Sequence, residues 1–164
     1  MADAESEATA AKGVDRCRGA RPADIPAILE LGARFHGESR FRCLPFDRTV
    51  LRARLEQALA RPDRYFVAVA EDASGLIGVL AGYLTTFYFC ASPVAMDACF
   101  YVRSDRRGGP SAKHLLAQFE SWARQHGVPH LLLGITSGVA DDRAEGFYRH
   151  LGFDTMGVVM GKEL

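Results

Sequence analysis

The segment from Val102 to Leu116 (VRSDRRGGPSAKHLL) holds residues whose types and order suit anion binding. Two arginines, two glycines and a proline follow one another at Arg106–Pro110, between a strand-like run and a helix-like run. Glycines let the backbone turn so that successive N–H groups point outward. The free N–H groups and the positive dipole at the start of the following helix favour an anion there. This segment therefore predicts a phosphate site at a strand-to-helix turn.

The charge balance indicates which kind of molecule carries that phosphate. The chain has 164 residues, with 20 Lys and Arg against 20 Asp and Glu, so its formal net charge is zero. Proteins that bind nucleic acids normally carry a basic excess that neutralises backbone phosphates. We therefore expect a small-molecule phosphate and no nucleic acid. A hydrophobic content of 48% is ordinary for one globular domain.

Cysteine and histidine usage bounds the chemistry further. The cysteines are widely spread and form no CxxC pair, which favours a reducing compartment and a cytoplasmic location. There is no apolar run of about 18 residues, so no membrane span is expected. The chain has five histidines, and we expect no metal site.

The first part of the chain predicts a tail, a strand and two helices. Residues 1–12 are rich in Ala and Glu and are expected to be a disordered tail before one domain at 13–164. A short strand is predicted at Asp15–Ala20. Apolar residues at helical spacing predict a helix over Ile25–Phe35, and a second helix begins near Asp47, which is placed as its N-cap.

The middle of the chain predicts strands. Tyr65–Ala70 and Leu76–Cys90 are apolar runs separated by a polar turn, which is typical of a hairpin. The second run is long for one strand, so it is expected either to bend near Gly82 or to extend past the sheet. Met96–Val102 is the next predicted strand.

The last part of the chain predicts two more helices and two more strands. A helix is expected from Ser111 to near Gly127, then a strand at His130–Ile135. A short helix follows at Ala144–Leu151, and a final strand is expected at Asp154–Met160. The order β-α-α-β-β-β-α-β-α-β predicts a mixed α/β or α+β single domain.

Two motifs in this order of elements resemble those of the GNAT superfamily of acyl-CoA-dependent N-acetyltransferases. That family has a turn of the form R-x-x-G-x-G/A before its third helix, and Arg107, Pro110 and Ala112 take its three positions. Its second signature has the form N-x-x-A-x-x-F-Y-x-x-x-G-F, and it falls on Asp141, Ala144, Phe147, Tyr148, Gly152 and Phe153. The resemblance covers nearly everything from Asp15 to Leu164.

The resemblance implies a cofactor site and a reaction. Acetyl-CoA would be the co-substrate, with its pyrophosphate on the turn and its pantetheine arm along the strand edge at Val102. The turn residues concerned are Arg107, Gly108, Gly109, Pro110, Ser111 and Ala112. Pro110 removes one N–H from the turn, although it suits the first turn of a helix. Asp141 replaces the family's usual Asn, and so adds a negative charge near the cofactor.

The resemblance also implies how catalysis would proceed. An amine attacks the thioester directly, and Tyr148 protonates the leaving thiolate, for which a phenol with a pKa of about 10 is a suitable donor. The general base is left open between Asp97, on the strand before the turn, and Glu38, after the first helix. None of the cysteines lies in a recognisable nucleophile setting, so no covalent intermediate is expected.

The acceptor, a small-molecule or peptide amine, is not identified by the sequence. In the family the segments corresponding to Gly37–Phe46 and Thr85–Pro93 wall its site. Arg40 or Arg42 could contact an anionic group on the acceptor. The aromatic residues of the second segment could instead pack in the core or at a homodimer contact. Two other functions stay open: a non-catalytic acyl-CoA sensor, and an interaction protein that uses this aromatic surface.

Overall fold

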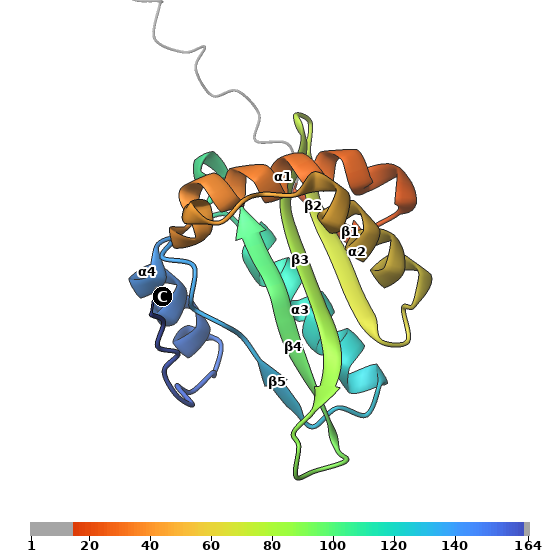
Figure 1. The fold of residues 1–164 in the computed structure, drawn as a ribbon, viewed down its shortest axis with the longest axis vertical. Helices are drawn as coiled ribbons and strands as arrows, with labels where there is room; N and C mark the ends of the chain where they lie inside the picture. The colour runs from red at the N-terminus through yellow and green to blue at the C-terminus, as the bar shows by residue number, and fades with distance from the viewer. Residues whose placement is uncertain (1–14, 163–164) are drawn as a thin grey trace, which may run out of the picture.

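Five strands form one sheet in the order β1-β2-β3-β4-β5, which follows their order in the chain (Figure 1). The computed structural model describes residues 15–162, so the predicted tail at 1–12 lies outside the described residues. The first four strands are antiparallel to their neighbours, and β5 is parallel to β4. The strands are β1 (Arg16–Gly19), β2 (Tyr65–Asp72), β3 (Gly75–Thr86), β4 (Pro93–Val102) and β5 (His130–Leu132).

Helices cover both faces of this sheet. The four α-helices are α1 (Ile25–Glu38), α2 (Arg48–Ala60), α3 (Ser111–Gln125) and α4 (Asp141–His150). Helices α1 and α2 pack on one face, α3 packs on the other, and α4 lies beside the β4–β5 side of the sheet (Figure 1). Three short 3-10 helices join them, η1 (Pro22–Asp24), η2 (Arg40–Cys43) and η3 (Ser104–Arg106). The predicted mixed α/β fold of one domain is confirmed.

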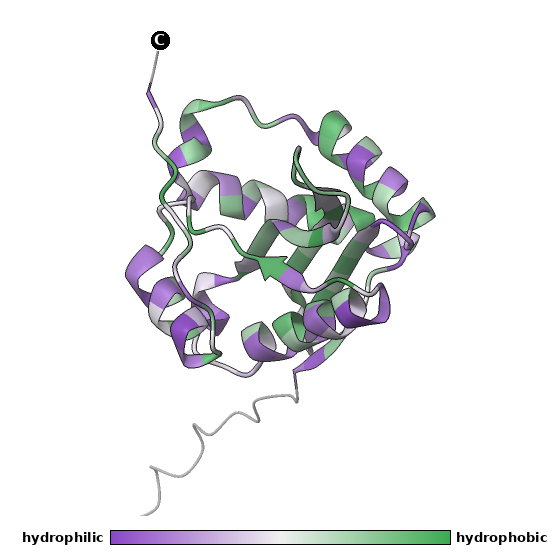
Figure 2. Ribbon diagram, turned by 90° about the horizontal axis from the view of Figure 1, so that it is seen from below, coloured by the Kyte–Doolittle hydropathy of each residue, from purple (hydrophilic) through white to green (hydrophobic). Residues whose placement is uncertain are grey.

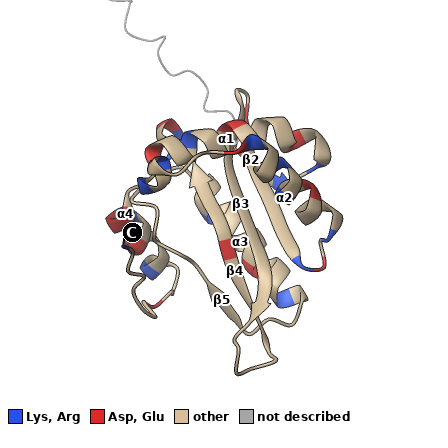
Figure 3. Cartoon of the chain, in the orientation of Figure 1, with Lys and Arg blue, Asp and Glu red and all other residues tan. Residues whose placement is uncertain are grey.

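The hydropathy pattern explains these layers. Apolar residues colour the strands and the inner faces of the helices, and polar residues colour the outer faces (Figure 2). Strand β3 has no charged residue, whereas charges gather on the helices and turns (Figure 3). Asp47 caps α2 as predicted, because its carboxylate accepts from the N–H groups of Thr49 and Val50 at 2.8 and 3.0 Å.

The core under α3 is packed against bare backbone. Phe119 is fully buried, and its ring lies over Gly82 of β3. A Cβ on Gly82 would come within 2.5 Å of that ring and 2.9 Å of the Met96 carbonyl oxygen. Glycine is therefore required here for close helix–sheet packing.

Strands β4 and β5 separate soon after they meet. They pair only over Val94–Met96, opposite β5. The register of β3 against β4 steps from Ala81 opposite Cys99 to Gly82 opposite Asp97, so Ala98 is an extra residue in β4. Such a bulge bends the strand and disrupts local pairing. Beyond it, the end of β4 has a free edge on the β5 side.

The predicted ends of two strands, β3 and β5, differ from the structure. Strand β3 ends at Thr86, so the apolar run Leu76–Cys90 extends past the sheet, which was one of the two expectations. The neighbouring strand β4 has a bulge opposite Gly82. Strand β5 ends at Leu132 rather than Ile135, because the chain leaves β4 there.

The final strand predicted at Asp154–Met160 is wrong. Residues 154–162 form no strand, and the apolar side chains of this segment are exposed by 78% to 87% at Met156, Val158, Val159 and Met160. A strand needs an edge to pair with, which an apolar sequence alone does not guarantee. No strand within the described part of the chain pairs with this segment.

None of the helices between residues 15 and 162 combines the length and apolar character needed to cross a lipid bilayer.

Candidate functional site

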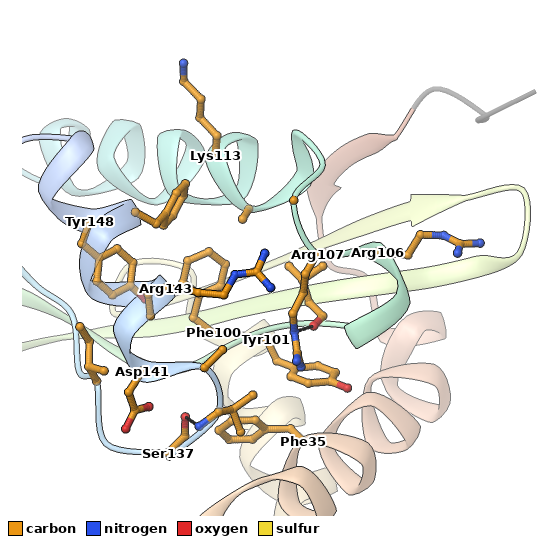
Figure 4. A pocket seen from close by; sticks show the side chains of 18 of the residues that line it. Phe35, Phe100, Tyr101, Arg106, Arg107, Lys113, Ser137, Asp141, Arg143 and Tyr148 are labelled. Atoms are coloured by element: carbon orange, nitrogen blue, oxygen red, sulfur yellow. Dashed lines mark hydrogen bonds between the residues drawn. The ribbon is translucent and has the colours of Figure 1, made fainter.

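A cavity of about 540 Å³ opens where β4 and β5 diverge. Its walls come from the end of β4, the turn before α3, the loop after β5, and α4, with Phe35 added from α1 (Figure 4). The cavity thus lies against the free edge of β4. Residues of both sequence motifs line it, from Arg107 to Ala112 and from Asp141 to Tyr148.

The turn before α3 presents unsatisfied backbone donors. Gly108 has a φ of +87°, a conformation that L side chains rarely adopt, and Pro110 stands at the N-cap of α3. Within residues 15–162, no acceptor receives the N–H groups of Gly108, Gly109 or Ser111. These donors and the helix dipole of the 15-residue α3 form a cradle that fits an anionic group.

Arg107, the basic position of the turn motif, is bonded within the protein. Its Nε donates to the Val102 carbonyl oxygen at 2.9 Å, and its Nη2 donates to the Glu38 carboxylate. Its guanidinium carbon lies 5.4 Å from the centroid of the Tyr101 ring. Arg107 therefore ties the end of α1 to the end of β4, and Figure 4 shows it beside Tyr101.

Arg143 is a further cation that faces the cavity. It reaches from α4 toward the middle of the pocket, whereas the Lys113 side chain points past α3 and away from the other lining side chains (Figure 4). Within the described residues Arg143 forms no ion pair. Arg106 is paired with Asp72 at 2.8 Å. Arg143 is therefore the cation most available to a phosphorylated ligand.

Tyr148 forms part of the cavity wall on the α4 side. Only 9% of the residue is exposed, and its ring packs against Phe100 and Phe153 at centroid distances of 6.4 and 5.9 Å. Burial, and then the nearby negative charge of Asp97, raise the pKa of the phenol above its usual value. The Tyr148 hydroxyl therefore stays protonated near pH 7.

Asp97 lies at the point where the two strands separate. Its Oδ1 accepts from the Gly134 backbone N–H at 2.8 Å, which bridges β4 to the chain that leaves β5. Burial raises the pKa of this carboxyl to about 6, and the backbone hydrogen bonds only partly oppose that rise. A carboxylate with such a pKa is poised to exchange a proton near neutral pH.

Glu38 is in a different environment from Asp97. Burial would raise its pKa, but hydrogen bonds from the Tyr101 hydroxyl at 2.6 Å and from Arg107 outweigh burial, and the pKa lies below its usual range. A carboxylate that accepts from two donors is a weak base. Glu38 is therefore better placed to fix Arg107 than to accept a proton from a substrate.

Asp141 begins α4, and it faces the cavity. Its Oδ2 accepts from Arg40 Nη2 at 2.9 Å, in an ion pair that joins η2 to α4. Its Oδ1 is buried and has no hydrogen-bond partner among the described residues. Ala140, just before it, has a φ of +53°, which places the start of α4 in a tight turn.

The structure brings most of the sequence-predicted site residues together. The cavity is lined by Val102, Arg107, Gly108, Gly109, Pro110, Ala112, Asp141 and Tyr148. Ser111 is fully buried and donates to the Asp15 carboxylate, so it contributes its backbone rather than its side chain. Asp97 and Glu38 lie just behind the wall, each bonded to a lining residue, Gly134 and Arg107 respectively.

Other lining residues were not predicted from the sequence. Asp141, Arg143 and Ala144 of α4 all line the cavity. The sequence could have indicated this shared position only if the helix had been predicted to start at Asp141, where α4 begins, rather than at Ala144. The loop after β5 shows no periodicity and gave no signal. Arg106, Ala144 and Phe147 belong to the two segments singled out in the sequence, and the lining residues without any such signal are Phe35, Phe100, Tyr101, Lys113, Gly134, Ile135, Ser137, Val139, Ala140 and Arg143.

The aromatic residues of the β3–β4 connection lie outside the core. Phe87, Tyr88 and Phe89 are 41%, 99% and 71% exposed, and the rings of Phe87 and Phe89 stack at 5.5 Å. The expectation that they pack in the core is therefore wrong, and contact with another molecule stays a prediction.

Solved structures share this fold. The aminoglycoside N-acetyltransferase AAC(6')-Iy in complex with CoA matches with a TM-score of 0.75 at 17% identity, over 94% of this chain and 97% of that one. Glucosamine-6-phosphate N-acetyltransferase from Arabidopsis thaliana matches with a TM-score of 0.71 at 14% identity, over 92% and 98% of the two chains. The aminoglycoside 6'-N-acetyltransferase AAC(6')-Ih from Acinetobacter baumannii matches with a TM-score of 0.71 at 17% identity, over 92% and 97%.

The family assignment rests on the sequence itself. No curated protein sequence is significantly similar to the chain. The family model described as "Acetyltransferase (GNAT) family" matches residues 26–153. This match confirms the resemblance seen in the two motifs, and acetyl-CoA is the co-substrate that goes with it. The chain belongs to the GNAT family of acetyltransferases.

Proposed function

We propose that the protein transfers an acetyl group from acetyl-CoA to an amine by direct attack, without a covalent enzyme intermediate. One observation carries the proposal: a single cavity joins an anion cradle, a free strand edge, and a buried tyrosine that stays protonated near pH 7. Family membership supports acyltransferase activity, and the geometry supports the order of the steps.

The donor would lie along the wall from the cradle to Tyr148. The N–H groups of Gly108 and Gly109 and the first turn of α3 would hold the pyrophosphate, assisted by Arg143. These residues fit the group because their backbone donors and cations have no competing partners within residues 15–162.

The free edge of β4 supplies donors for the rest of acetyl-CoA. The N–H of Arg103 donates to Ile77 on β3, and alternate residues of a strand point to opposite edges. The backbone groups of Val102 and Phe100 therefore point toward the cavity side. Arg107 already donates to the Val102 carbonyl oxygen. Of the two backbone groups of Val102, the N–H therefore remains to bind the pantetheine arm.

Chemistry would occur where β4 and β5 part. The amine nitrogen forms a bond to the thioester carbonyl carbon, and a backbone N–H on the β4 edge stabilises the oxyanion. Asp97 accepts the proton that the amine loses, directly or through a water. The C–S bond then breaks, and the Tyr148 hydroxyl gives its proton to the departing sulfur. We favour Asp97 over Glu38 as the base because only Asp97 has a raised pKa.

The charges near the cavity favour a particular acceptor. Asp141 is the acidic residue among the described lining residues, and Arg40 pairs with it. Glu38, close behind the wall, is paired with Arg107. Asp97, the proposed base, is in no ion pair, but this one carboxylate does not balance several positive charges, so a neutral or anionic amine, such as a phosphorylated amino sugar, fits better than a polycationic aminoglycoside.

The test is thiol release from acetyl-CoA across a panel of amines. The panel contains glucosamine 6-phosphate, a neutral amino sugar, an aminoglycoside and a lysine peptide, with Tyr148→Phe measured beside the wild type. We expect turnover with at least one amine, ordered anionic or neutral before polycationic. Binding of CoA without thiol release from any acceptor would indicate the sensor function instead.

A further inference from the structure

We propose that Arg40 is a positioning residue for the acyl donor: it neutralises Asp141 so that α4 can accept the pantetheine arm of CoA. This inference rests on the proposed function and names a residue outside both family motifs. It answers a difficulty in the sequence, where an acidic residue stands in the middle of a site for an anionic molecule.

The segment from Glu38 to Arg40 contacts both walls of the cavity. Glu38 accepts from Arg107 beside the cradle, and two residues later Arg40 donates to Asp141 on α4. Between them, Ser39 is 1% exposed, donates to the His36 carbonyl oxygen at 3.0 Å, and accepts from the Phe41 N–H. The segment is therefore fixed in place. It directs the negative charge of Glu38 toward Arg107 and the positive charge of Arg40 toward α4.

Backbone contacts hold Arg40 in place as well. Its N–H donates to the Ser137 carbonyl oxygen at 2.7 Å, in the loop that leads into α4. Its guanidinium lies against Gly138, where an added Cβ would be 3.0 Å from Arg40 Nε. Gly138 has a φ of +74°, so both the conformation and the available space favour glycine at this contact. Asp141 and Ser137 lie on the same side of the pocket (Figure 4).

The ion pair between Arg40 and Asp141 uses only one of the two carboxylate oxygens of Asp141. Arg40 binds Oδ2 of Asp141, whereas Oδ1 is buried and has no partner among the described residues. A buried acceptor without a donor is costly, so the Arg40 bond to Oδ2 carries the stabilisation of this carboxylate.

Charge explains why Arg40 is needed. CoA carries several negative charges, and an uncompensated Asp141 carboxylate beside it would repel them. With Arg40 in place the pair has no net charge. The side chain of Arg40 is 61% exposed, so its loss should affect ligand binding more than folding.

The experiment is calorimetric titration of the full chain with CoA at low ionic strength. The variants are Arg40→Ala, Arg40→Ala with Asp141→Asn, and Arg42→Ala, which removes the other cation of η2 and has no ion pair within residues 15–162. Arg40→Gln, neutral and of similar reach, replaces Arg40→Ala if that variant does not fold.

We expect Arg40→Ala to raise the Kd for CoA about tenfold, which corresponds to about 1.4 kcal/mol. Adding Asp141→Asn removes the unpaired charge and keeps an acceptor oxygen, so the Kd should return to within about threefold of wild type. Arg42→Ala should leave the Kd within about twofold. Rescue by Asp141→Asn is the readout that a merely structural Arg40 would not give.

Two results would overturn the inference while CoA still binds the wild type. One is an unchanged Kd in Arg40→Ala, and the other is a double variant no better than Arg40→Ala. Absence of CoA binding by the wild type would be a different result, since it removes the proposed function on which the inference rests.

Discussion

The two sides of the sheet are built in opposite ways. From β1 to β4 the strands pair continuously, and α1, α2 and α3 bury apolar side chains against them. From β4 to β5 the pairing lasts three residues and then gives way to a cavity with charged residues in its walls. One side uses its backbone groups for stability, whereas the other leaves them free for a ligand.

This difference locates the chemistry. The bulge at Ala98 and the Asp97–Gly134 hydrogen bond mark the boundary between the two sides. Stability should therefore be sensitive to changes on the closed side, and activity to changes on the open side. A variant on the closed side that lowered activity without lowering stability, or the reverse on the open side, would contradict this comparison.

The largest expected effect is on the closed side. Phe119→Ala should lower the free energy of unfolding by about 3–5 kcal/mol, because Phe119 is fully buried over Gly82. Urea unfolding followed by circular dichroism measures it. Phe89→Ala, at a residue that is 71% exposed, is the matched control and should change little. Equal effects of the two substitutions would contradict the packing described for α3.

The second-largest effect is expected for Asp97, which lies at the boundary between the two sides of the sheet. Asp97→Asn should lower kcat/KM by about 100-fold if this carboxylate accepts the amine proton. Because its pKa is raised to about 6, the base is protonated below that pH and ionised above it, so wild-type kcat/KM should rise as pH increases through about 6. A pH profile of thiol release would show this limb. A profile that is flat between pH 5 and 7 in the wild type would exclude Asp97 as the base.

Tyr148 should have a smaller effect. A thiolate with a pKa of about 8.5 to 9 leaves readily, so it needs less help from an acid than an alkoxide would. Tyr148→Phe should reduce kcat about tenfold, with the KM for acetyl-CoA nearly unchanged. Steady-state kinetics with varied acetyl-CoA separate the two parameters. An equal rise in KM would mean that the hydroxyl binds the donor instead.

Much of this contrast was predictable from the sequence. The glycine turn and the second motif identified both ends of the cavity, because their residue types are required locally. The ion pair between Arg40 and Asp141 was not predictable, since 101 positions separate the two residues and only the fold brings them together. The loop after β5 has no periodic pattern, so its contribution to the wall was also missed.

The wrong final strand has the same cause. Asp154–Met160 has the composition of a strand, but pairing depends on an edge elsewhere in the fold. Here β4 and β5 diverge, and the following segment lies exposed.

The smallest effect is expected in that exposed segment. Val158 is 82% exposed, so Val158→Ser should change the free energy of unfolding by less than about 0.5 kcal/mol. The same urea unfolding experiment measures it. A loss above about 1 kcal/mol would show that the segment is packed against another surface in solution, such as a second copy of the chain.

The most direct measurement is a thermal-shift titration with CoA, comparing the wild type with an Arg107→Glu, Gly109→Glu double variant. A ligand that binds only the folded state stabilises it by about 2.7 kcal/mol at a hundredfold excess over Kd. If the open side of the sheet is the donor site, the wild type should show a clear rise in Tm and the variant should show none. A wild type whose Tm does not respond to CoA, or a folded variant that responds equally, would contradict the account.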